Sequence, residues 1–89
     1  MKKTENQRLR SAILEVINNQ IRNNNPPETK QTLIRLQGEG FTEQEALKLI
    51  GCVVASVVFR VLRENHPYDE ELYRAALIAL PKLPWEKGN

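Results

Sequence analysis

The stretch from Phe41 to Glu64, FTEQEALKLIGCVVASVVFRVLRE, decides the fold of this chain. It opens with Thr42 and Glu45 at the spacing of a capping box, in which each side chain accepts a hydrogen bond from the backbone N–H of the other residue. Phe41 and Ala46 stand where a hydrophobic staple places its two apolar residues. We therefore expect a helix over residues 43–64.

The body of this segment is apolar on every side of a helix. Its five valines would also suit a strand. The length of the segment, its N-terminal cap and the lack of an internal turn signal favour a helix. Because a helix that is apolar all round belongs in the middle of a fold, we predict that the other elements pack around it.

Three further segments have the pattern of amphipathic helices. Residues 4–24 begin with Thr4 and Gln7 at capping-box spacing and end in three asparagines. Residues 27–37 follow two prolines and are expected to bury Leu33, Ile34 and Leu36. Residues 70–80 follow Asp69, a good N-cap, and lead to a tail over residues 81–89. The sequence therefore predicts a single domain, residues 1–89, that is an all-α, compact bundle of four helices.

Composition and length favour a cytoplasmic protein. Apolar residues make up 40% of the chain and charged residues 27%, which is globular composition. Cys52 is the one cysteine, so no intrachain disulfide is expected. The basic N-terminus is not followed by an apolar signal-peptide region, and the run from Leu49 to Phe59 falls short of the roughly 18 residues that span a bilayer. We expect no membrane association.

Residues suited to catalysis or to metal binding are sparse and scattered. His66 precedes a proline in a loop, and Cys52 lies among valines in the middle of a helix, where a buried thiol is inert. Glu70 and Glu71 are adjacent, so they point to different sides of a helix and do not form a carboxylate pair. We therefore predict no catalytic residues, no metal site, no cofactor and no enzymatic activity.

Two features suggest contacts with other molecules. Gly51 and Ala55 lie on one helix face, where small residues permit either an internal helix crossing or a self-association strip. Trp85 lies in the tail, where it either folds back over the helices or anchors a partner. Both pairs of alternatives are open at this point.

The charge is unevenly distributed. Residues 1–37 carry seven Lys/Arg and three Glu, a net +4, whereas residues 38–89 carry six Lys/Arg and eight Asp/Glu, a net −2. The candidate anion-binding residues are Lys2, Lys3, Arg8, Arg10 and Arg22. We expect a protein-interaction module, with a homodimer as one form. The alternative is weak binding to nucleic acid or an anionic surface through the basic half.

A pattern of short motifs resembles short bacterial helical proteins of unknown function. It runs N-x-P-P-E at residues 24–28, E-A at 45–46, I-G at 50–51, P-x-D at 67–69 and A-L-x-x-L-P at 76–81. The resemblance implies a compact helical fold and no established activity. Some of these proteins carry histidines at the positions of Gln44 and Lys48, so a metal role imagined for them does not transfer to this chain.

Overall fold

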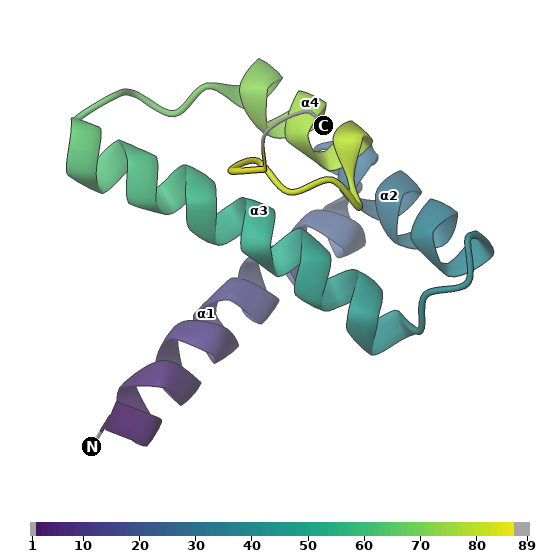
Figure 1. The fold of residues 1–89 in the computed structure, drawn as a ribbon, viewed down its shortest axis with the longest axis horizontal. Coiled ribbons are helices and arrows are strands. Elements are labelled where there is room, and N and C mark those ends of the chain that lie inside the picture. Colours follow the sequence, from purple (N-terminus) through teal and green to yellow (C-terminus); the bar gives the residue numbers. More distant parts are fainter. Residues whose placement is uncertain (1, 87–89) are drawn as a thin grey trace.

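The part of the chain that the structure describes has four helices, and the other three pack around the third (Figure 1). The computed structural model describes residues 2–86, and the side chains of residues 7–86. The helices are α1 (Lys2–Asn23), α2 (Pro27–Gly38), α3 (Glu43–Glu64) and α4 (Glu70–Ala79). α3 contacts each of the other three, and no strand occurs among the described residues. The predicted all-α four-helix bundle with a central third helix is confirmed.

The local signals in the sequence set most helix ends. Thr42 Oγ1 accepts a hydrogen bond from the Glu45 N–H at 3.0 Å, and Glu45 Oε1 accepts one from the Thr42 N–H at 2.9 Å. Asp69 Oδ1 accepts two hydrogen bonds from backbone N–H groups in the first turn of α4. Asn24 and Asn65 adopt left-handed backbone where α1 and α3 end. The predicted caps at Thr42 and Asp69 are therefore confirmed.

The start of α1 differs from the prediction. The helix begins at Lys2, so Thr4 lies inside it and is not the N-cap. The side chain of Thr4 lies outside the described residues. The other observed helix bounds agree with the predicted ranges to within one residue.

The core lies where α3 meets its three neighbours. Val53 and Ile50 of α3 are fully buried there, and Val54 is 6% exposed. Side chains from every other helix join them. The remaining buried apolar residues are Ile17, Leu36, Ala46, Tyr73, Leu77 and Leu80.

A small polar junction joins α1, α2 and α4 beside this core. Gln20 Oε1 accepts hydrogen bonds from Thr29 Oγ1 at 2.7 Å and from the Tyr73 hydroxyl at 2.8 Å. Thr29 and Tyr73 are both buried, so their hydroxyls need an acceptor inside the protein. α2 thus packs partly through threonines, and the prediction that Ile34 is a core residue is wrong, since Ile34 is 59% exposed.

The C-terminal part of α3 is not covered. α3 has 22 residues, whereas α2 has 12 and α4 has 10. At about 1.5 Å per residue the two shorter helices span roughly half of α3. Val58, Phe59 and Leu62 are 46%, 58% and 78% exposed. The expectation that the apolar helix is buried on all faces is therefore wrong over its last turns.

Candidate interaction surface

α1 and α3 cross at Gly51. A Cβ atom added to Gly51 would lie 3.4 Å from Ile13 Cγ2 and 4.0 Å from Ile17 Cδ1. Gly51 therefore packs against α1 within one chain. Of the two alternatives for this glycine, the contact with α1 supports the internal crossing.

Beyond this crossing the two helices diverge. Residues 2–16 of α1 and residues 52–64 of α3 form two limbs that point to the same side of the molecule, and Ile13 of the α1 limb lies at the crossing itself. We call this arrangement the fork (Figure 1). Six large apolar side chains of the two limbs are exposed: Leu9, Leu14, Val16, Val58, Phe59 and Leu62. We call the five of them other than Leu14 the fork surface.

The α3 limb carries the more continuous part of the fork surface. Ala55, Val58, Phe59 and Leu62 follow the spacing i, i+3, i+4, i+7, which places them on one helix face. Ala55 is half-buried, and exposure rises toward Leu62. Half-buried Ala55 thus stands at the start of an apolar strip that runs away from Gly51 toward the end of α3.

A groove of about 290 Å³ lies at the base of the fork. Valines of both helices form most of its wall. The polar groups in it are the Gln20 amide and the hydroxyls of Tyr68 and Tyr73, and the Gln20 amide oxygen already accepts from Tyr73. The lining residues are Val16, Gln20, Val54, Val57, Val58, Val61, Leu62, Tyr68 and Tyr73. Such a lining suits apolar side chains rather than a charged ligand.

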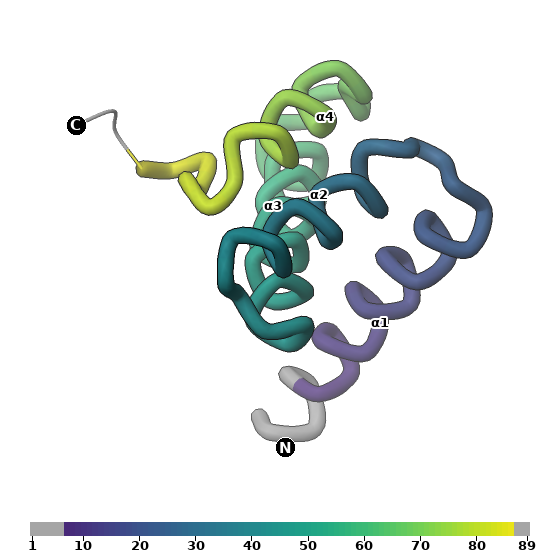
Figure 2. Tube along the Cα trace, turned by 90° about the vertical axis from the view of Figure 1, so that its right-hand side faces the viewer, coloured from purple at the N-terminus to yellow at the C-terminus, as the bar shows by residue number. Residues whose placement is uncertain are grey.

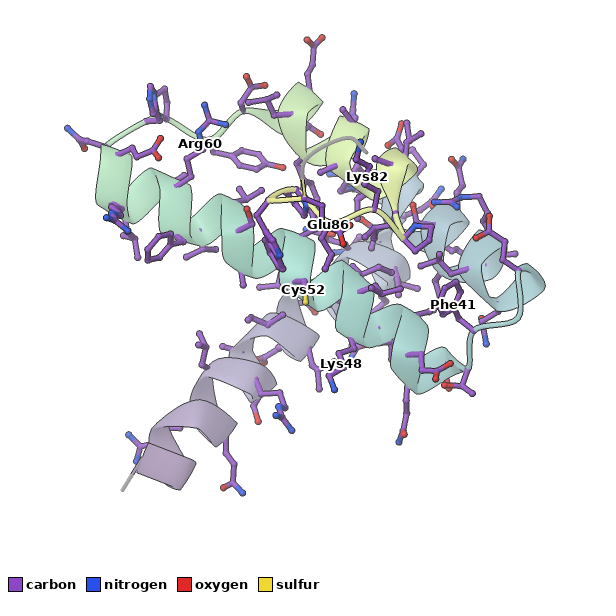
Figure 3. All side chains as sticks on the ribbon, in the orientation of Figure 1. Phe41, Lys48, Cys52, Arg60, Lys82 and Glu86 are labelled. Atoms are coloured by element: carbon purple, nitrogen blue, oxygen red, sulfur yellow. The ribbon has the colours of Figure 1, made fainter. Side chains whose placement is uncertain are left out.

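A second groove, of about 690 Å³, lies on the α4 side of the same part of α3. Its lining includes charged residues, and Arg60 and His66 of this lining both lie close to Glu64. Arg60 Nε lies 3.4 Å from Glu64 Oε1, and His66 Nε2 lies 3.8 Å from the same oxygen. Figure 3 shows Arg60 beside the segment that joins α3 to α4. Burial raises the pKa of Tyr68, which lines both grooves, and the nearby Glu70 carboxylate raises it further.

The residues considered for catalysis or metal binding lie far from one another. His66 is exposed in the segment between α3 and α4, as predicted. Cys52 is half-buried near the middle of α3 and not fully buried as expected (Figure 3). Three turns of helix separate Cys52 from the end of α3. Among the described residues, no group of three or more His, Cys, Asp or Glu side chains is placed to hold a metal ion.

The candidate anion-binding residues do not gather in one patch where the structure describes them. Arg8 and Arg10 are two residues apart, which places them on nearly opposite sides of α1. Arg22 lies near the other end of α1, and its guanidinium donates to Asn19 Oδ1 at 3.2 Å. The side chains of Lys2 and Lys3 lie outside the described residues.

Trp85 does not fold back over the helices. Its side chain is 60% exposed, whereas Leu83, two residues earlier, packs against the core. The alternative in which Trp85 covers the bundle is therefore wrong. Figure 2 shows the C-terminal tail leaving on the side of α3 opposite to α1.

The apolar pattern of residues 43–64 predicts that the α3 part of the fork surface lies in the core. The signal that could have separated Val58, Phe59 and Leu62 from the core is length, since a helix over residues 43–64 exceeds what helices over 27–37 and 70–80 can cover. Residue type carries no such signal, because valine is buried at positions 53 and 54 and exposed at position 58.

Within residues 2–86, none of the helices combines the length and the apolar content that a membrane crossing requires. The resemblance to short bacterial proteins stays a prediction from the motif pattern. No family model matches this chain, and no curated protein or solved structure is detectably similar to it.

Proposed function

We propose that this protein is a non-enzymatic protein-interaction module whose fork surface binds an apolar stripe on a protein partner. The observation that carries the proposal is the exposure of five large apolar side chains on two neighbouring limbs, with an apolar groove between them. Contiguous exposed apolar patches of several hundred Å² on soluble proteins mark interaction sites, because water is excluded from them when a partner binds.

The shape of the fork favours a helical partner. Two diverging helices leave room for a third helix, whose side chains at i, i+3, i+4 and i+7 enter the space between them. The groove at the base accepts one or two of these side chains. Arg63 stacks over the Phe59 ring at 5.3 Å from its centroid, which places a cation at the edge of the apolar strip.

Photo-crosslinking tests this proposal. A photoreactive amino acid placed at Leu62 should form a covalent adduct with a protein partner in cells, because Leu62 is the most exposed member of the fork surface. The same amino acid at Ile78 is the matched control, since Ile78 is 64% exposed on α4. Adducts of equal yield at both positions, or none at Leu62, would contradict the proposal.

A charge in the fork provides the second control. Val58→Asp, in the chain that carries the photoreactive residue at position 62, should abolish the adduct while circular dichroism shows an unchanged helix content. An adduct that survives this change would show that the partner binds elsewhere.

A further inference from the structure

We infer that the helix bound in the fork is acidic: an amphipathic helix of another protein, with carboxylates on both sides of its apolar stripe. This inference rests on the proposed function of the fork surface and names the chemistry of its partner. Two properties of the limbs support it, namely the positive charge of both limbs and the arginines that lie beside their exposed apolar residues.

The positive charge of the chain is concentrated in the two limbs. Residues 2–16 contain four Lys/Arg and two Glu, a net +2, and residues 52–64 contain two Arg and one Glu, a net +1. The limbs together carry +3, although the whole chain carries only +2, so the remaining residues sum to −1. The basic part of the chain is therefore also the part that exposes the fork surface.

Arginines lie next to the apolar residues on both limbs. The guanidinium of Arg63 lies 5.3 Å from the centroid of the Phe59 ring, at the edge of the α3 strip. Among the described side chains, no carboxylate forms an ion pair with Arg63. On α1, Arg8 and Arg10 lie one position before and after Leu9, about 100° to either side of it around the helix. Carboxylates that flank the apolar stripe of a bound helix would meet these cations.

Charge distinguishes the fork surface from exposed apolar residues elsewhere. Leu72 of α4 is 48% exposed, but it follows Glu70 and Glu71 directly. Arg74 of the same helix lies within ion-pair distance of Glu28 and Glu70, so its charge is already compensated. Exposed apolar area alone does not select a partner. Exposed apolar area beside uncompensated positive charge selects one that is both apolar and acidic.

The recessed groove at the base of the fork favours a helix over a lipid surface. This groove of about 290 Å³ is walled mostly by valines. A flat anionic bilayer would contact the ends of the limbs, whereas the side chains of a helix reach into a groove. Carboxylates spread along a helix also match cations that are spread over two limbs and not gathered in one patch.

Two matched peptides test the sign of the partner's charge. Both are helices of about 21 residues with leucines at i, i+3, i+4 and i+7, and the positions beside the leucines are glutamate in one and lysine in the other. In fluorescence anisotropy at low salt, the acidic peptide should bind at least about tenfold more tightly. The ratio should fall as salt is added, because ions screen exposed charges. Equal affinities, or no binding of the acidic peptide at millimolar concentration, would overturn the inference.

Three variants test where the acidic peptide binds. Arg63→Glu should weaken the acidic peptide and strengthen the basic one. Lys82→Glu makes the same change of charge in the exposed tail, outside the limbs, and should leave both affinities nearly unchanged. Leu62→Lys keeps the fork basic but removes its most exposed apolar side chain, so it should also weaken the acidic peptide. Binding that Leu62→Lys does not weaken would show that charge acts without the fork surface, and would overturn the inference.

Vesicles test the lipid alternative. At physiological ionic strength the chain should stay in the supernatant when vesicles of mixed phosphatidylcholine and phosphatidylserine are pelleted. If the chain pellets with these vesicles and Leu62→Lys does not, the fork binds an anionic lipid surface and the inference is overturned.

These tests separate the inference from the proposed function. If photo-crosslinking at Leu62 captures a protein while the two peptides bind equally, the proposed function stands and the acidic partner is overturned. If Leu62 gives no adduct and neither peptide binds, both are overturned.

Discussion

The hydroxyl of Tyr73 donates a hydrogen bond to Gln20 Oε1 at 2.8 Å, across 53 positions of the chain. The same oxygen accepts a second hydrogen bond from Thr29 Oγ1. One amide oxygen thus joins α1, α2 and α4 next to the groove at the base of the fork. The orientation of α1, and with it the opening of the fork, depends on this junction.

Replacing the acceptor Gln20 should lower the free energy of unfolding more than removing the hydroxyl of Tyr73 does. Gln20→Leu leaves two buried hydroxyls without an acceptor, at about 1–3 kcal/mol each, whereas Tyr73→Phe removes one hydrogen bond worth about 1 kcal/mol. Urea unfolding of the two variants should show this order. Asn18→Leu, an exposed change on α1, should have little effect. A smaller loss for Gln20→Leu than for Tyr73→Phe would contradict the geometry.

Burial of Tyr73 should make the fold sensitive to alkaline pH. Burial raises the pKa of Tyr73 above its ordinary value of 10.0 and outweighs the hydrogen bonds that lower it. The folded state then holds the phenolic proton more tightly than the unfolded chain does. The free energy of unfolding should therefore be unaffected by this group below pH 10 and should fall as pH rises above 10. Tyr73→Phe should show a shallower fall between pH 9 and 11 in thermal unfolding.

A charge at position 54 should unfold the domain. Val54 is 6% exposed, and burying an unpaired carboxylate costs several kcal/mol, which is comparable to the total stability of a small domain. Val54→Asp should therefore lose its helical circular dichroism at 25 °C. Val58→Asp, one turn later and 46% exposed, is the matched control and should stay folded. A cooperative thermal transition in Val54→Asp would show that this face of α3 is not in the core.

A small side chain at position 51 should raise the stability of the fold, and a large one should lower it. Gly51→Ala adds a Cβ at 3.4 Å from Ile13 Cγ2, which is ordinary contact, and should raise stability by up to about 1 kcal/mol through helix propensity. Gly51→Leu should lower it by about 1–3 kcal/mol, because the added atoms collide with α1. Ile13→Ala should restore part of this loss. Equal melting temperatures for the alanine and leucine variants would place α1 farther from α3 than the structure does.

Local signals predicted the helices well because their causes are local. The capping box at Thr42 and the N-cap at Asp69 form between residues at most three positions apart. The left-handed Asn24 ends α1 for a reason contained in one residue. The start of α1 was placed two residues late, since a capping-box spacing at Thr4 and Gln7 does not by itself stop a helix from extending further.

The candidate surface could not be predicted in the same way. Val54 and Val58 are both valines of one apolar helix, so the sequence does not tell them apart. Which of them is buried depends on where α1 crosses α3 and on how far α2 and α4 extend along it. The place of the crossing follows from Gly51 against Ile13, a contact between residues 38 positions apart. The burial of the tail residues could not be predicted either. Leu83 packs against the core whereas Trp85 is exposed, and the sequence does not distinguish these two apolar residues.

The sequence by itself determined the four helices of residues 2–86, all of their ends but the start of α1, and the central place of the helix over residues 43–64. These properties follow from side-chain periodicity and from hydrogen bonds that close within one turn. The tertiary structure alone decided that the end of α3 is exposed, that Gly51 is used inside the chain and that Gln20 joins three helices. Burial is a property of packed helices, and it depends on their lengths and crossing points rather than on the identity of any one residue.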